Sequence, residues 1–263
     1  LHENTLFVLD EAHAVSDKGS TIDLFREQLG LHLRGDNTSS RIVGITATPY
    51  PYSYTDIPLL YLPPGKNYYG IEDMKAKGLL FSSFNLSDIE ARIRLRTAVF
   101  EKGKPYPPKY GIIRLPKNTK EQRVVRRGIS ELLDKTKIEI VVYDQYSTCD
   151  LNKKYLEQRP EKMTLIFIKD KVRMGVRLDT THLLFVHERP VSTYTHTVIQ
   201  GLLGRCTGYG KAGHAVKIFC DLEKVEAHLK WMHSGYSKDA LPSDVKEIYK
   251  TLGELKPSSY FRK

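Results

Sequence analysis

Near its amino terminus the chain reads Leu6-Phe7-Val8-Leu9-Asp10-Glu11-Ala12-His13, four apolar residues followed directly by an acidic tetrapeptide. So short an apolar run, ended by polar residues, predicts a buried parallel strand of an α/β domain. Open α/β sheets bind ligands at the carboxyl ends of their strands, which is where Asp10 and Glu11 fall. One carboxylate there can hold Mg²⁺, directly or through water, and the other can orient or deprotonate a water that attacks a phosphoryl group. An exposed acidic turn is the simpler alternative.

Two further motifs stand in a fixed order after this one. The apolar run Arg41-Ile42-Val43-Gly44-Ile45 predicts a second strand and ends in Thr46-Ala47-Thr48-Pro49. Near the other end of the chain stands Gln200-Gly201-Leu202-Leu203-Gly204-Arg205. Together the three motifs resemble motifs II, III and VI of superfamily 2 helicases and translocases of the DEAH-box type, and the last is similar to phage and viral members. Residues 169–175 resemble motif V, with Gly175 at its turn.

The resemblance implies an ATP-dependent helicase or translocase that hydrolyses ATP with Mg²⁺ as two RecA-like domains close on DNA or RNA. It implies that Asp10 holds Mg²⁺ and Glu11 handles the attacking water, while Arg205 neutralises charge on the γ-phosphate from the second domain. The implied catalytic residues are Asp10, Glu11, His13, Gln200 and Arg205; the implied nucleotide contacts are Asp10, Glu11, Gly175 and Arg205; Thr46 and Thr48 would couple nucleotide state to nucleic acid.

The sequence departs from the family pattern in its phosphate loop. No Gly-x-x-x-x-Gly-Lys-Ser/Thr segment occurs in the 263 residues, although that loop cradles the β- and γ-phosphates in the family. We therefore expect the chain to be the carboxyl-terminal part of a longer protein. We also expect that the 263 residues alone do not hydrolyse ATP.

The motif around Arg205 departs from the pattern as well. The common pattern has a second arginine three residues after the Gly-Arg pair, and Gly208 stands there instead. The glutamine is also one residue further from the glycine than is usual. Lys211 or an arginine from elsewhere in the chain would have to supply the second positive charge.

Composition and periodicity divide the chain into four parts of an α/β protein with RecA-like parallel sheets. Residues 1–49 predict strand, helix (about 20–33) and strand, the carboxyl-terminal part of a first RecA-like domain. Residues 50–108 are dense in proline and tyrosine and predict an irregular connector with a polar helical segment at 87–99 embedded in it. Its tyrosines pin loops to a surface or, alternatively, stack on bases. Residues 109–222 alternate short apolar runs, among them 138–143 and 163–168, with helices, and predict a complete second RecA-like domain. The predicted helices include a polar stretch between those two runs and a helix at about 193–203. Residues 223–263 predict a helical extension.

The charge of the chain favours a polyanionic partner. The net charge is +10 and the isoelectric point is about 9.3, which suits nucleic acid, with DNA favoured over RNA. Basic residues gather around a predicted helix at 119–133, although a solvated helix face would look the same. The residues predicted to bind nucleic acid are Lys117, Asn118, Arg123, Arg126 and Arg173.

Cysteine usage and hydropathy indicate the compartment. Cys149, Cys206 and Cys220 are odd in number and widely spaced, which is typical of reduced thiols and not of a disulfide framework or a zinc site. No apolar stretch approaches the ~18 residues that cross a bilayer, so no membrane partner is expected. We expect an intracellular, cytoplasmic protein, and the oligomeric state stays open.

Two classes of function remain. In the first, the protein is a nucleic-acid-dependent ATPase, either a helicase or the motor subunit of a restriction-type complex. In the second, it is a non-catalytic RecA-like module that binds nucleic acid or a partner. Asp10, Glu11 and Arg205 favour the first class, because a module without turnover has no use for them.

Overall fold

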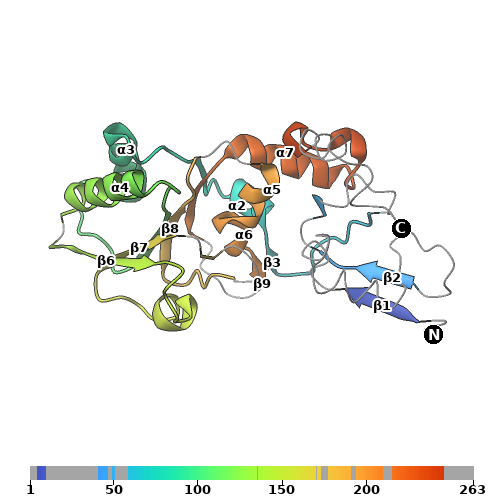
Figure 1. Ribbon diagram of the computed structural model, residues 1–263, viewed down its shortest axis with the longest axis horizontal. Helices are drawn as coiled ribbons and strands as arrows, with labels where there is room; N and C mark the ends of the chain where they lie inside the picture. Colours follow the sequence, from blue (N-terminus) through green and yellow to red (C-terminus); the bar gives the residue numbers. More distant parts are fainter. Residues whose placement is uncertain are drawn as a thin grey trace. The chain divides into compact units, whose positions relative to one another are not determined.

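The computed structural model describes residues 5–9, 41–46, 49–50, 59–134, 136–169, 171–172, 177–190, 194–209 and 215–245 (Figure 1). The chain divides into two compact units. One comprises Pro63–Glu226, and the other comprises Leu1–Leu62 together with Ala227–Lys263. None of the described helices is both long enough and apolar enough to cross a bilayer.

The larger unit is built on a six-stranded parallel sheet. Its strands, in spatial order, are β4 (Leu80–Ser82), β10 (Lys217–Cys220), β8 (Leu183–His187), β5 (Tyr110–Arg114), β7 (Met163–Ile168) and β6 (Ile138–Tyr143). The predicted α/β class with a parallel sheet is confirmed.

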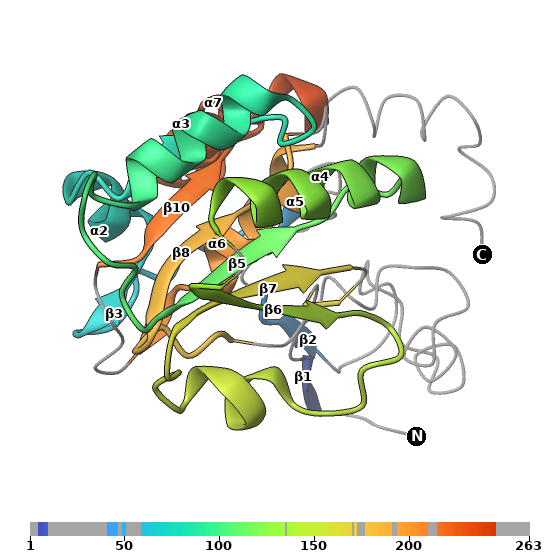
Figure 2. The same cartoon turned by 90° about the vertical axis from the view of Figure 1, so that its left-hand side faces the viewer.

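The apolar runs form these strands because both faces of the sheet are covered. All six positions of β7 are buried, as expected of an inner strand that reads as a continuous apolar run. The helices α3 (Ile89–Val99) and α4 (Thr119–Leu132) lie along one face (Figure 2). Their apolar residues, among them Leu95 and Ile129, share one core with Leu165 and Phe185 of the sheet.

The segment at 50–108 is more regular than we predicted. The helical segment predicted at 87–99 is confirmed as α3, and the segment also contains α2 (Ile71–Ala76) and the edge strand β4, which pairs with β10 through Leu80 and Ile218. The prolines that suggested an irregular connector fall at its two ends, and residues 65–104 contain none. The interior of the segment is therefore free to form backbone hydrogen bonds, and the compact unit begins at Pro63.

A short antiparallel ribbon adds to the same unit. Strand β3 (Tyr68–Tyr69) pairs with β9 (Gly208–Tyr209), and the rings of Tyr68 and Tyr209 meet edge to face with centroids 5.1 Å apart. The polar stretch between β6 and β7, which we expected to be helical, forms the π-helical turn η3 (Asn152–Leu156).

The other unit contains the two strands predicted at the amino-terminal end. The first of them is not buried as predicted, because Leu6 is 61 % exposed and Val8 is 57 % exposed. Strands β1 (Leu6–Leu9) and β2 (Arg41–Gly44) pair in parallel, with Leu6 opposite Arg41 and Leu9 opposite Gly44. Their carboxyl ends therefore lie at the same edge of this small sheet. The helix predicted at about 20–33 lies outside the described residues.

A second core in this unit joins Tyr50 to the carboxyl-terminal region. Tyr50 is 1 % exposed and packs on Trp231 with ring centroids 4.8 Å apart, and Leu241 and Val245 complete the cluster. The Tyr50 hydroxyl lies 2.6 Å from Nδ1 of His228. Regular structure in this region comprises α7 (Leu222–His233) and the 3₁₀ turn η4 (Lys238–Ala240). Tyr50 thus has the packing role that we favoured for the tyrosines.

Candidate functional site

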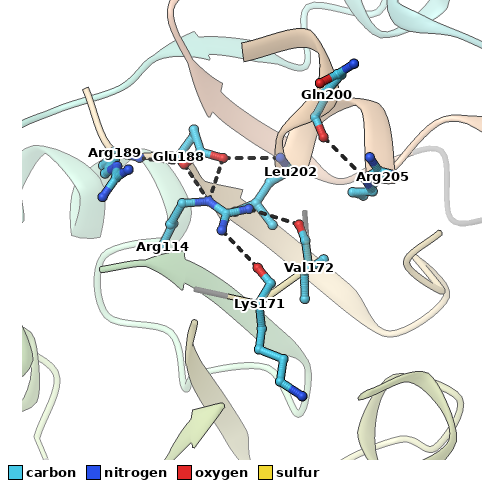
Figure 3. Close-up of polar contacts among 8 residues, drawn as sticks. All are labelled: Arg114, Lys171, Val172, Glu188, Arg189, Gln200, Leu202 and Arg205. Atoms are coloured by element: carbon cyan, nitrogen blue, oxygen red, sulfur yellow. Dashed lines mark hydrogen bonds and ion pairs between the residues drawn. The ribbon is translucent and has the colours of Figure 1, made fainter. Parts of the chain in front are cut away.

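The carboxyl edge of the six-stranded sheet carries an ion pair that is almost completely buried. Arg114 is the last residue of β5, and Glu188 directly follows β8. Nε of Arg114 lies 2.7 Å from Oε1 and 2.9 Å from Oε2 of Glu188 (Figure 3). The two side chains are only 9 % and 13 % exposed, so water screens this pair far less than a surface pair.

Arg114 also holds the start of the loop that follows β7. Its Nη1 donates to the carbonyl of Lys171 at 3.0 Å, and its Nη2 donates to the carbonyl of Val172 at 3.2 Å. Val172 is buried with φ of 59°, a left-handed conformation that is costly for a β-branched residue. The two arginine bonds help to fix this strained turn at the point where the sequence resembles motif V.

Glu188 holds a helix on its other side. Its Oε2 accepts from the backbone N–H of Leu202 at 3.2 Å, and its Oε1 accepts from the N–H of Arg189 at 3.3 Å (Figure 3). Leu202 is the first residue of α6 (Leu202–Arg205). The ion pair therefore connects the loop at 171–172 to the helix that ends in Arg205.

The helix predicted at about 193–203 is divided by Gly201. Helix α5 (Thr195–Gln200) ends there and α6 begins, because Gly201 has ψ of −153°. A β-carbon at Gly201 would lie 2.8 Å from Oε2 of Glu188. Glycine therefore allows the carboxylate to approach the start of α6, a contact that the local sequence could not reveal.

The two residues predicted from motif VI lie together at this site. Nε of Arg205 donates to the backbone carbonyl of Gln200 at 3.2 Å, and both side chains are half-buried (Figure 3). The Arg205 carbonyl accepts from the N–H of Leu178 at 2.8 Å. Backbone bonds thus hold α6 beside the segment that follows the loop after β7. The neighbouring Cys206 thiol is no nucleophile at neutral pH, because burial raises its pKa to about 12.

Several predicted residues are not brought together by the described structure. Asp10, Glu11, His13, Thr48, Arg173, Gly175 and Lys211 lie outside the described residues. Thr46 is described, and it is half-buried two residues beyond β2. In the part of the chain that the structure describes, no three His, Cys, Asp or Glu side chains group to hold a metal ion.

The basic helix α4 presents the predicted nucleic-acid contacts to solvent. Lys117, Arg123 and Arg126 are exposed. Asn118 is exposed as well and also caps the helix, since its Oδ1 accepts from the N–H of Lys120 at 2.8 Å. Exposure leaves these side chains available to phosphates.

Sequence reasoning missed Arg114 and Glu188. Both occupy the carboxyl end of a predicted strand, the same position that drew attention to Asp10. A charged residue at the end of an apolar run was therefore the available signal. Their pairing spans 74 residues and could not be inferred from one sequence.

His187, the last residue of β8, is a fully buried polar residue at the same edge. Its Nε2 accepts from the N–H of Phe84 at 3.2 Å, so Nε2 carries no proton, and its ring stacks on Phe219. Burial lowers its pKa to about 3. The imidazole is therefore neutral at physiological pH and serves the packing of the sheet edge.

Lowering the pH from 7 to 5 should lower the free energy of unfolding. Burial holds the pKa of His187 at about 3 and that of His228 at about 4, against an ordinary 6.5. Between pH 6.5 and those pKa values the unfolded chain binds more protons than the folded chain. The stabilisation from the neutral histidines is therefore fully present above pH 6.5 and is lost as the pH falls through this window. Within this window each histidine should lower the free energy of unfolding by about 1.4 kcal/mol for each pH unit. Urea unfolding at pH 7, 6 and 5 measures the slope.

His187→Gln serves as the matched variant for this measurement. Glutamine keeps an acceptor for the Phe84 N–H but does not titrate. The slope of the free energy of unfolding against pH should therefore fall by about 1.4 kcal/mol per pH unit, the contribution of one proton. An unchanged slope would show that His187 does not stay neutral in the folded protein.

The chain is similar to a viral protein over most of its length. No family model matches the chain. The chain is 34 % identical over 255 residues to an uncharacterized protein, L594, of Acanthamoeba polyphaga mimivirus. The match covers 94 % of this chain and 64 % of the mimivirus protein. The chain thus spans somewhat less than two thirds of a viral relative whose name states no activity.

Proposed function

We propose that the chain belongs to the motor of an ATP-dependent nucleic-acid helicase or translocase with RecA-like domains. One observation carries the proposal. The Arg114–Glu188 pair joins the loop resembling motif V to the helix resembling motif VI, at the carboxyl edge of a parallel sheet. Open α/β sheets bind their ligands at that edge. Two motifs that respond to the same nucleotide must be held in a fixed position relative to each other, which the ion pair does here.

The proposed roles follow from the chemistry of phosphoryl transfer. Mg²⁺, when bound, would neutralise charge on the phosphate oxygens, with Asp10 as its protein ligand. Glu11 would accept a proton from the attacking water. Arg205 would neutralise the charge that builds on the transferred phosphoryl group, because a guanidinium stays protonated at any relevant pH.

The non-catalytic module is the competing proposal, and ATP turnover separates the two. The natural polypeptide that contains these residues should hydrolyse ATP, faster with single-stranded nucleic acid present. A protein that binds single-stranded DNA but never hydrolyses ATP would favour the module.

Helix α4 is the nucleic-acid surface in this proposal, and its contacts should depend on salt. Replacing Arg123, Arg126 and Arg127 with alanine should lower the affinity for single-stranded DNA about a hundredfold at 0.1 M salt and reduce the slope of log K against log salt by roughly 2. The affinity depends on salt because each contact between an arginine and a phosphate releases counterions from the nucleic acid. Fluorescence anisotropy of a labelled oligonucleotide across a salt series measures both quantities.

A charge-matched variant controls for net charge. Lys153, Arg159 and Lys162 are equally exposed, and they lie near the π-helical turn instead of on α4. Their replacement with alanine should change affinity far less. Equal losses in the two triple variants, or binding that ignores salt, would remove α4 from the proposal.

A further inference from the structure

A buried hydrogen bond lies next to the motif that follows β2. Tyr50 comes directly after Thr46-Ala47-Thr48-Pro49, and its hydroxyl lies 2.6 Å from Nδ1 of His228, 178 residues away. Tyr50 is 1 % exposed and His228 is 5 % exposed, so water does not compete for this bond. Burial raises the pKa of Tyr50 above its ordinary 10 and lowers the pKa of His228 to about 4. At pH 7 the bond therefore joins a neutral hydroxyl to a neutral imidazole.

The apolar contacts of Tyr50 do not require its hydroxyl. Its ring packs on Trp231 with centroids 4.8 Å apart, and Leu241 and Val245 belong to the same core. A phenylalanine ring would fill the same volume and make the same ring contacts. A buried hydroxyl, however, must be paired to offset the loss of its water. The bond to His228 therefore specifies one orientation of the tyrosine ring, which apolar packing alone would not do.

The side chains around His228 are held in place as well. His228 and Trp231 are three residues apart on α7, so they lie on the same side of that helix. Nε1 of Trp231 donates to the carbonyl of Ser237 at 3.1 Å, and the Trp231 ring meets Tyr236 edge to face with centroids 4.8 Å apart. The hydroxyl of Tyr50 is thus bonded to a fixed surface.

Pro49 extends this constraint towards the motif. A proline fixes its own φ at about −65° and disfavours the helical region for the residue before it. Fewer backbone rotations are therefore free between Tyr50 and residues 46–48 than in an ordinary loop. At its other end the segment begins with Thr46, which is half-buried two residues beyond β2. Residues 46–48 are consequently held by β2 on one side and by Tyr50 on the other.

We propose that Tyr50 is a positioning residue of the proposed motor, which holds residues 46–48 in place through its hydrogen bond to His228. This inference rests on the proposed function and on the coupling role that the family resemblance implies for Thr46 and Thr48. A segment that couples the nucleotide to nucleic acid needs a fixed support against which it moves. The buried pair of Tyr50 and His228 provides that support. The alternative is a tyrosine that only packs.

Removing the hydroxyl alone tests the proposal in the natural polypeptide that contains these residues. Tyr50→Phe should lower the kcat of ATP hydrolysis with single-stranded DNA present about three- to tenfold, the range that one neutral hydrogen bond contributes. The KM for ATP should not change, because the substitution alters no group that is proposed to hold the nucleotide. Hydrogen exchange of the backbone amides of residues 42–50, measured by mass spectrometry, should become faster.

Substitutions of His228 separate the hydrogen bond from the packing. His228→Asn keeps an amide that can bond the hydroxyl, so kcat should be largely retained. His228→Leu keeps bulk without a polar atom and should lose at least as much activity as Tyr50→Phe. The double variant of Tyr50→Phe with His228→Leu should be no worse than His228→Leu alone, since both changes remove the same bond. Tyr61→Phe, on a ring that meets Tyr236, is the matched control and should leave kcat and exchange unchanged.

The outcomes distinguish this inference from the function on which it rests. Unchanged kcat in Tyr50→Phe, in a protein that hydrolyses ATP, would show that the tyrosine only packs, and the motor proposal would stand. Equal losses in His228→Asn and His228→Leu would also overturn the role of the bond. If the unmodified protein hydrolyses no ATP, the proposed function fails, and unchanged exchange of residues 42–50 in Tyr50→Phe would separately show that the pair does not hold the segment.

Discussion

Arg205→Ala should lower nucleic-acid-stimulated ATP hydrolysis about a thousandfold, within the range known for arginines that neutralise a transferred phosphoryl group. The affinity for ATP should change little, because the first domain of the proposed motor would still hold the nucleotide. The folded structure should persist, because Arg205 is the last residue of the short helix α6 and is only half-buried. Steady-state ATPase rates with and without single-stranded DNA, together with nucleotide binding, measure the effect.

Two companion variants sharpen this result. Glu11→Gln should keep ATP binding and nearly abolish hydrolysis, because an amide cannot accept the proton of the attacking water. Lys211→Ala tests whether that lysine supplies the second positive charge of the motif. Full stimulated turnover in Arg205→Ala would remove the motif VI interpretation.

Arg114→Ala should lower the free energy of unfolding by about 3–5 kcal/mol, the usual cost of leaving one member of a buried ion pair uncompensated. Glu188 would keep its charge at a site where it is 13 % exposed, and the carbonyls of Lys171 and Val172 would lose their donors. Urea denaturation measures the change. A control substitution, Arg126→Ala on the exposed face of α4, should stay within roughly 0.5 kcal/mol.

A double variant tests the cause of that loss. Arg114→Met with Glu188→Gln removes both charges and keeps an acceptor for the N–H of Leu202. It should be more stable than Arg114→Ala, because no unpaired charge remains. If the single variant costs less than about 1 kcal/mol, in the range of exposed pairs, the Arg114–Glu188 pair is not the anchor that we describe.

Most strands of the six-stranded sheet could be predicted from the sequence, because each apolar run stands out from the polar residues on either side of it. The bounds of β6 and β7 match the predicted runs, and α4 begins at the predicted threonine behind its Asn118 cap. Strand β4 was missed because it is three residues long and is stabilised by pairing with β10, far away in the chain. Its local composition carries no comparable signal.

The candidate site could be predicted only in part, for a similar reason. Gln200 and Arg205 belong to one local motif and were found. Arg114 and Glu188 act through each other and through partners on other segments, and a single sequence does not contain those pairings. The division of the predicted helix at Gly201 likewise follows from the approach of Glu188, a tertiary contact that overrides local helix propensity.

The order of strands in the sheet has a consequence for synthesis of the protein. Among the strands that the structure describes, β4 pairs with β10 alone, so its backbone groups have no ladder partner in this sheet until Cys220 has left the ribosome. At about 5–20 residues per second, the ribosome needs roughly 7–28 s to make the stretch from Ser82 to Cys220. From the synthesis of β8 to that of β10, the edge of β8 that β10 will cover is open as well. The nascent chain must therefore keep two strand edges from pairing with neighbouring polypeptides, and nascent chains ended before β10 would be prone to aggregate.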